Sequence, residues 1–137
     1  MSANPSTGSS EPRGELASRI VAMPANINPS GDIFGGWIMS VMDVSGGITA
    51  ARIAAGRVVT VAVSRMVFMQ PVKVGDVVCC YTALNRTGRS SITLDVEVWV
   101  LRHGQEPRFK VTEAEIVYVA VDAAGRPRPL SGESAAG

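Results

Sequence analysis

The segment FGGWIMSVMDVSGGITAARIAA, residues 34–55, decides the fold of this chain. Its apolar residues recur at steps of three and four, at Trp37, Val41, Val44, Ile48, Ala51 and Ala55. This spacing is typical of one face of an α-helix, and Gly56 is expected to end the helix. Because Ile38, Met39 and Met42 add apolar side chains on its other sides, we expect the helix to be enclosed by the rest of the fold.

Strand-like runs surround this helix in the sequence. Residues 16–23 are predicted to form a first strand, residues 24–31 a loop, and four further strands follow at residues 58–69, 76–84, 90–101 and 109–121. Short polar links, QPVKVG, NRTGR and RHGQEP, join the last four runs and imply hairpins. The sequence therefore predicts an α+β fold in which a curved antiparallel sheet wraps one long helix.

The composition is that of one globular domain with balanced charge. A chain of 137 residues with 46% apolar residues can bury a core of its own. The chain has 13 basic and 12 acidic residues, so it lacks the excess positive charge that general binding of nucleic acid requires, and such a partner is excluded. We expect the domain at residues 14–124, between flexible tails at residues 1–13 and 125–137. Removal of residues 1–12 and 126–137 is expected to leave activity intact.

The sequence carries no sign of export or of a membrane partner. The N-terminal residues MSANPSTGSSEPRGE lack the apolar stretch of a secretory signal, and no segment approaches the roughly 20 apolar residues of a membrane span. Cys79 and Cys80 are neighbours in a strand-like run, so their side chains point to opposite faces and are predicted to be buried free thiols. We therefore expect a cytoplasmic protein.

A stripe of small residues on the predicted helix carries one carboxylate, Asp43. Gly35 and Gly36 lie in the expected first turn, where main-chain N–H groups lack helical partners and can hold an oxyanion. Asp43 lies eight residues beyond Gly35, a rise of about 12 Å, which is too far for both to act on one carbonyl group. If both serve one site, Asp43 at that site comes from a second chain, whose helix runs antiparallel beside the first.

Both features also have purely structural interpretations. A carboxylate in an apolar helix is often a paired structural ion or an exposed position, and two glycines at a helix start often only accommodate packing. GDIFGG is not a phosphate loop, because no Lys-Ser/Thr pair follows it. From spacing alone, the catalytic and structural interpretations of Asp43 stay equally open.

Several motifs together resemble the YciA-like acyl-CoA thioesterases of the hotdog superfamily. They are MPANINPSGDIFGGWIMSVMD at residues 23–43, GRVVTVAV at 56–63, VGDVVCCY at 74–81, GRSSI at 88–92, VEVWV at 96–100 and YVAVD at 118–122. The resemblance covers roughly residues 13–128. Relatives often have His at the position of Phe34, but the YciA-like branch resembles this chain in carrying Phe, so Phe34 is assigned no catalytic role.

The resemblance implies a hotdog fold, hydrolysis of acyl-CoA without metal or cofactor, and dimers that assemble further, commonly into a hexameric trimer of dimers. It implies that Asn28 orients the thioester or water, that Gly35 and Gly36 supply oxyanion donors, and that Asp43 is the base or nucleophile. Contacts to coenzyme A are expected from Arg57, Thr60, Gly88, Arg89, Ser90 and Ser91. The preferred acyl group, nucleotide regulation and pathway are not predicted. Arg52, Asp95, Glu97, Glu113 and Glu115 are expected to be solvated.

Two other functions remain as alternatives on the same fold. A hydratase or dehydratase of acyl thioesters generally pairs His with a carboxylate, but the single histidine, His103, lies in a polar link far in sequence from the glycine pair. A non-catalytic module that binds acyl-CoA would use the same pocket without turnover. The presence of Asn28, both glycines and Asp43 together favours the enzyme.

Overall fold

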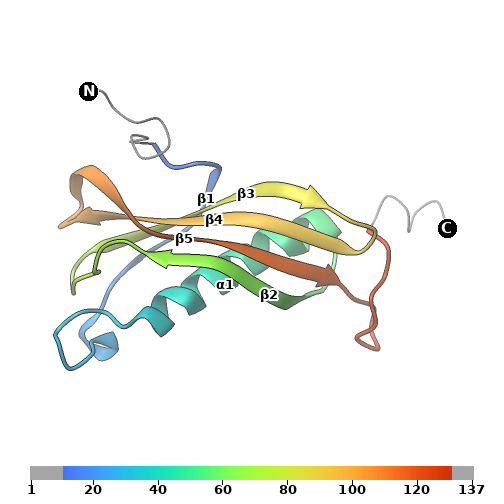
Figure 1. Cartoon of the computed structure of the whole chain (residues 1–137), viewed down its shortest axis with the longest axis horizontal. Coiled ribbons are helices and arrows are strands. Elements are labelled where there is room, and N and C mark those ends of the chain that lie inside the picture. The colour runs from blue at the N-terminus through green and yellow to red at the C-terminus, as the bar shows by residue number, and fades with distance from the viewer. Residues whose placement is uncertain (1–10, 131–137) are drawn as a thin grey trace.

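One long helix and five strands make up the part of the chain that the computed structural model describes, residues 11–130 (Figure 1). The strands are β1 (Glu15–Val21), β2 (Val58–Phe68), β3 (Val77–Thr87), β4 (Ser91–Arg102) and β5 (Gln105–Ala120), and the helix is α1 (Gly35–Ala54). A short 3-10 turn, η1 (Pro24–Asn26), lies within the predicted loop. The predicted helix and strands are confirmed, with bounds that differ by a few residues.

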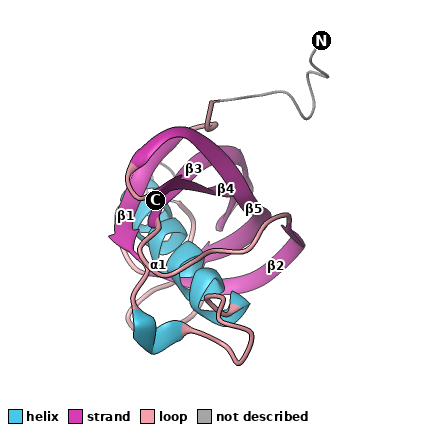
Figure 2. Cartoon of the chain, turned by 90° about the vertical axis from the view of Figure 1, so that its left-hand side faces the viewer, coloured by secondary structure: helices cyan, strands magenta, loops and turns pink. Residues whose placement is uncertain are grey.

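The five strands form one antiparallel sheet that curls around α1 (Figure 2). Their order is β1-β3-β4-β5-β2, so β1 and β2 are its two edges. Along β4, Leu94, Val96 and Val98 join the core that packs against α1. Because side chains alternate along a strand, Asp95 and Glu97 lie on the opposite face. The α+β arrangement predicted from the sequence is confirmed.

Only one side of α1 packs on the sheet, so the prediction that the helix is enclosed is wrong for the single chain. Its buried residues are Ile38, Met42, Ser45, Gly46, Thr49, Ala50 and Ala54. The apolar face predicted from the sequence lies on another side, where Val44 and Ile48 are 63% and 56% exposed. A helix that is apolar nearly all round gives no periodic signal for the face that meets the sheet.

The C-terminal end of α1 is closed one residue earlier than predicted. Ala55, not Gly56, takes the left-handed conformation, with φ of 56°, and the Gly56 N–H bonds to the carbonyl of Ala51. A Cβ at position 56 would lie 2.5 Å from the guanidinium of Arg128 and would displace that group. That guanidinium donates to the carbonyls of Ala54 and Val121.

Residues at the inner ends of both predicted tails contact the domain. Arg13 donates from its side chain to Asp95 and from its main chain to Glu97. At the other end, the N–H of Leu130 bonds to the carbonyl of Arg89, and its side chain packs against the core. These contacts join residues far apart in sequence, so local composition does not reveal them. Residues 1–10 and 131–137 lie outside the described part of the chain.

Cys79 and Cys80 are both buried and free, as predicted. Cys80 belongs to the core beneath α1, whereas Cys79 packs with Tyr81 and Trp99 on the opposite face of the sheet. Burial raises the pKa of the Cys80 thiol to about 11. Between residues 11 and 130, no helix has the length and hydropathy required to cross a membrane.

Candidate active site

Asp43 lies in the middle of α1 and faces β2 and β5. Its Oδ1 accepts a hydrogen bond of 2.7 Å from Thr60 Oγ1, and the Tyr118 hydroxyl lies 3.2 Å from the same oxygen. Among the ion pairs of residues 11–130, none includes Asp43. Within these residues, the side chain of Asp43 is therefore held by hydroxyl groups rather than by a cation. Asp43 borders a cleft of about 200 Å³, together with Met39, Ser40, Val63, Met66 and Ile116.

Asn28 and Gly35 line a second cleft, of about 390 Å³, beside the N-terminal end of α1. The other walls come from the end of β2 and the segment after it, including Phe68 and Val72. Asn28 Oδ1 accepts hydrogen bonds from the main-chain N–H groups of Ser30 and Asp32, which fixes its side chain. Its amide nitrogen has no acceptor within the described chain and is available as a donor.

Gly35 and Gly36 occupy the first turn of α1, as predicted. Phe34 precedes them without a side-chain cap, and neither glycine N–H has an acceptor among residues 11–130. Unpaired N–H groups at a helix start attract negative charge. Gly35 lies under the ring of Phe68, where a Cβ would come within 3.2 Å of that ring, whereas Gly36 lies against Phe34 and outside the cleft. Gly35 is thus the better placed of the two donors.

The clefts of Asn28 and Asp43 follow one another along the groove between α1 and β2. Phe68 and Met69 border the first, and Val63 and Met66 border the second. The described chain therefore does not bring Asp43 together with Asn28 and Gly35. This separation agrees with the distance expected from their spacing on the helix.

The residues expected to contact coenzyme A separate into two groups. The turn between β3 and β4 contains Gly88, Arg89 and Ser90, and Ser91 begins β4. This turn lies at the same end of the molecule as the C-terminal end of α1 (Figure 1). Arg57 lies at this end too, because its carbonyl accepts from Val121 and its neighbour Val58 pairs with Ala120 of β5. Thr60 instead contacts Asp43.

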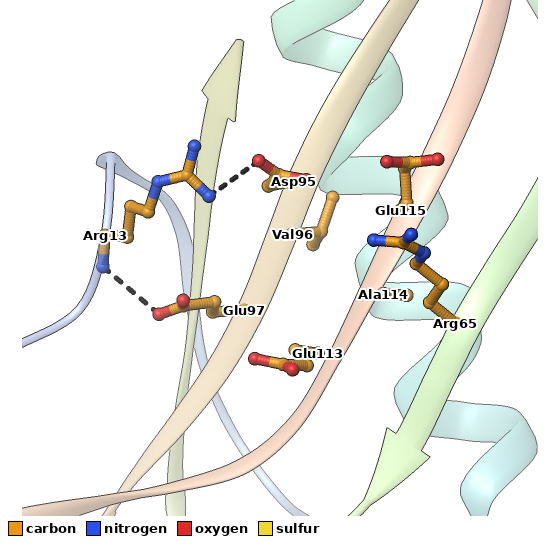
Figure 3. A pocket seen from close by; sticks show the side chains of 8 residues that line it. All are labelled: Arg13, Arg65, Asp95, Val96, Glu97, Glu113, Ala114 and Glu115. Carbon is orange, nitrogen blue, oxygen red and sulfur yellow. Dashed lines mark hydrogen bonds and ion pairs between the residues drawn. The ribbon is translucent and has the colours of Figure 1, made fainter. Parts of the chain in front are cut away.

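A group of carboxylates lies on the face of the sheet away from α1 (Figure 3). Asp95 pairs in register with Glu115, and Glu97 with Glu113, beside Arg13 and Arg65. The expectation that all four are solvated is wrong for Asp95, Glu97 and Glu115, whose side chains are 21%, 12% and 16% exposed. Alternation along both strands could have signalled this group. Within residues 11–130, no three acidic, His or Cys side chains are grouped as a metal site.

Residues 30–106 match the family profile described as the Thioesterase superfamily. The chain belongs to the thioesterase superfamily. Within it, the chain is 57% identical over 122 residues to the acyl-CoA thioester hydrolase YciA of Salmonella typhimurium, with 87% of this chain and 92% of that protein covered. The resemblance to the YciA-like branch is thus confirmed.

Solved structures of this superfamily share the fold. A hexameric thioesterase from Yersinia pestis, y2039, superposes with a TM-score of 0.85 at 57% identity, covering 88% of this chain and 98% of that one. A mutant of HI0827, a hexameric broad specificity acyl-coenzyme A thioesterase, also has a TM-score of 0.85, at 53% identity, covering 88% and 89%. The predicted hotdog fold is therefore confirmed.

Proposed function

We propose that this chain hydrolyses acyl-CoA thioesters to the free acid and coenzyme A, in active sites shared between two copies of the chain. Asp43 of one copy acts as general base or nucleophile, and Asn28 and Gly35 of the other bind the thioester carbonyl, with Gly36 as the less well placed donor. Relatives named acyl-CoA thioester hydrolases, more than half identical to this chain, support the reaction.

The main support for an active site shared between two chains is the separation of Asp43 from Asn28 and Gly35 within one chain. On α1, Met39 lies midway between Gly35 and Asp43 and is 43% exposed. A two-fold axis near Met39 would place each Gly35 opposite the other chain's Asp43. A two-fold pair contains two such sites, each complete only when both chains are present.

The outer edge of β2 is the surface on which we place the second copy. β2 pairs with β5 on one side only, and Val59, Val61, Val63 and Val67 along it are exposed. A long exposed apolar edge strand is a template for pairing with another strand. Pairing of two β2 strands would continue the sheet and bring the two α1 helices side by side.

The chemistry follows from these groups. Asp43 activates a water molecule that attacks the carbonyl carbon, and the N–H donors stabilise the negative charge that develops on the carbonyl oxygen. Collapse of the tetrahedral intermediate breaks the C–S bond, and coenzyme A leaves as a thiolate that takes up a proton. If Asp43 attacks directly, a mixed anhydride forms first and water then opens it. Neither route requires a metal ion or a cofactor.

The phosphates of coenzyme A are proposed to lie at the end of the molecule that carries Arg57 and the turn Gly88–Ser91. Arg57 and Arg89 are exposed there, and guanidinium groups bind phosphate through charge-assisted hydrogen bonds. The Gly88 N–H bonds to the carbonyl of Ser91, which closes a tight turn with its serines at the rim. Thr60 is not part of this proposal, because it contacts Asp43.

Further assembly into a trimer of dimers would use a different surface. Val44 and Ile48 on α1, with Ile20 on the neighbouring strand β1, are exposed apolar residues away from β2. The hexameric relatives support this arrangement. Two buried free thiols fit a reducing compartment, and we propose the cytoplasm as its location.

Release of free thiol from short, medium, long and aromatic acyl-CoAs tests the reaction. The wild-type chain is expected to hydrolyse some of them, and Asp43→Asn to lose turnover while keeping its assembly. Glu113→Gln, the same chemical change on the far face of the sheet, is the matched control. Tight binding without turnover across the panel would favour the binding module, and full activity of Asp43→Asn would place the catalytic group elsewhere.

A further inference from the structure

The hydroxyl group of Tyr118 reaches from the sheet into the middle of α1. It donates to the main-chain carbonyl of Asp43 at 2.9 Å and lies 3.2 Å from Asp43 Oδ1. We propose that Tyr118 and Thr60 are positioning residues, which hold the Asp43 carboxylate in its reactive orientation by binding one of its two oxygens. This proposal rests on the proposed function, since it assigns residues that act through Asp43.

Two hydroxyl groups approach the same carboxylate oxygen, and Tyr118 shares its single proton between this oxygen and the main-chain carbonyl of Asp43. Thr60 Oγ1, from β2, donates to Oδ1 at 2.7 Å, and the Tyr118 hydroxyl, from β5, approaches the same atom. Within residues 11–130, Asp43 Oδ2 accepts no hydrogen bond. Fixing one oxygen restricts rotation of the carboxylate while leaving the other free to take a proton from water or to attack carbon.

Gly46 makes room for the Tyr118 hydroxyl. A Cβ at Gly46 would lie 2.3 Å from that hydroxyl oxygen and 3.1 Å from the ring carbon that carries it. No other residue type therefore fits position 46 while the hydroxyl stays beside Asp43. A glycine inside a helix costs about 1 kcal/mol relative to alanine. The space for the hydroxyl at position 46 is therefore present despite this loss of helix stability.

Tyr118 is suited to hold a fixed position. Its side chain belongs to the core and is only 1% exposed. Burial raises the pKa of Tyr118, and the negative charge of nearby Asp43 raises it further. The hydroxyl therefore stays a protonated donor whenever Asp43 is charged. A rigid strand on one side and a helix on the other thus hold the carboxylate between them, as precise placement of a reacting group requires.

Steady-state kinetics of Tyr118→Phe, Thr60→Val and Thr60→Ser in the intact assembly test the proposal. Both Tyr118→Phe and Thr60→Val should lower kcat roughly 10- to 100-fold, with KM changed by less than about threefold, because a misplaced reacting group costs turnover rather than affinity. Thr60→Ser keeps a hydroxyl and should retain most of the wild-type activity, unlike Thr60→Val.

Tyr81→Phe is the matched control, because the hydroxyl of Tyr81 binds Arg108 on the face of the sheet away from α1. It should leave both kcat and KM unchanged. Gly46→Ala, which displaces the hydroxyl without removing it, should lower kcat as Tyr118→Phe does. If Tyr118→Phe does not fold, Gly46→Ala and Thr60→Val decide the question by the same readouts.

Normal kcat in Tyr118→Phe and Thr60→Val, beside an inactive Asp43→Asn, would overturn the positioning proposal and leave the proposed function standing. Absence of acyl-CoA hydrolysis by the wild type would overturn the proposed function instead. In that case, crystal structures of the same variants decide the positioning claim: an Asp43 carboxylate that changes orientation supports it, and one that keeps its orientation contradicts it.

Discussion

Arg128 donates a hydrogen bond of 2.9 Å to the carbonyl of Ala54, the last residue of α1, which lies 74 residues earlier in the chain. A cation at this end of a helix satisfies an unpaired carbonyl and complements the helix dipole. Arg128→Ala should therefore lower the free energy of unfolding by about 1–2 kcal/mol. Urea unfolding followed by circular dichroism measures this change.

The exposed Arg126, two residues away, provides the control, since its side chain makes no hydrogen bond or ion pair within the described chain and only its main chain bonds to Asp122. Arg126→Ala should unfold like the wild type. Removal of residues 131–137 should be tolerated, whereas removal of residues 126–137 also deletes Arg128 and Leu130 and should destabilise the protein. Equal stability of both truncated proteins would show that the packed C-terminal segment contributes nothing.

The buried thiol of Cys80 predicts a loss of stability in alkaline solution. Its pKa is raised from 9.0 to about 11 by burial, so between these pH values the unfolded chain loses the proton and the folded chain keeps it. The unfolded state then binds fewer protons, and the free energy of unfolding should fall by roughly 2–3 kcal/mol across this window. The raised pKa of Tyr118 acts in the same direction at still higher pH.

Unfolding at pH 8, 9, 10 and 11 measures this dependence, and Cys80→Ala provides the comparison. The variant has no thiol to ionise at this position, so its stability should fall less steeply above pH 9, whatever its stability at neutral pH. Parallel curves for the two proteins would show that Cys80 does not titrate differently in the folded and unfolded states.

Arg89 is predicted to bind a phosphate of coenzyme A. Arg89→Gln should raise KM for acyl-CoA by roughly 3- to 10-fold and leave kcat nearly unchanged, because the contact is made equally in ground and transition states. The effect should disappear with an acyl-pantetheine thioester, which lacks the nucleotide phosphates. Arg108→Gln, at the opposite end of the sheet, is the control. If Arg89→Gln raised KM equally for acyl-CoA and for the acyl-pantetheine thioester, the assignment would be contradicted.

The order and type of the secondary structure elements could be predicted because the signals are local. Alternation along residues 92–100 identifies β4, and three- and four-residue spacing identifies α1. The face of α1 that meets the sheet could not be predicted in the same way. Val44 and Ile48 are as apolar as Ile38 and Met42, and only the sheet determines which pair is buried.

The site shows the same division. Gly35 and Asp43 could be identified from the helix start and its spacing, supported by the family resemblance, whereas Asn28 followed from that resemblance alone. Tyr118 could not, since a tyrosine in a strand gives no sign that its hydroxyl crosses the core to a helix residue 75 positions away. The predicted role of Thr60 in binding coenzyme A likewise followed from its motif alone, whereas the contact with Asp43 depends on how β2 lies beside α1.

Complementation between two inactive variants tests the shared active site most directly. Asp43→Asn and Asn28→Ala are each expected to be inactive alone. When the two are unfolded together and refolded, half of the pairs contain both variants, and each such pair has one site with intact Asp43 and Asn28. The mixture should therefore recover about a quarter of the wild-type activity, as two-fold symmetry requires. A mixture no more active than its two components would contradict the shared site.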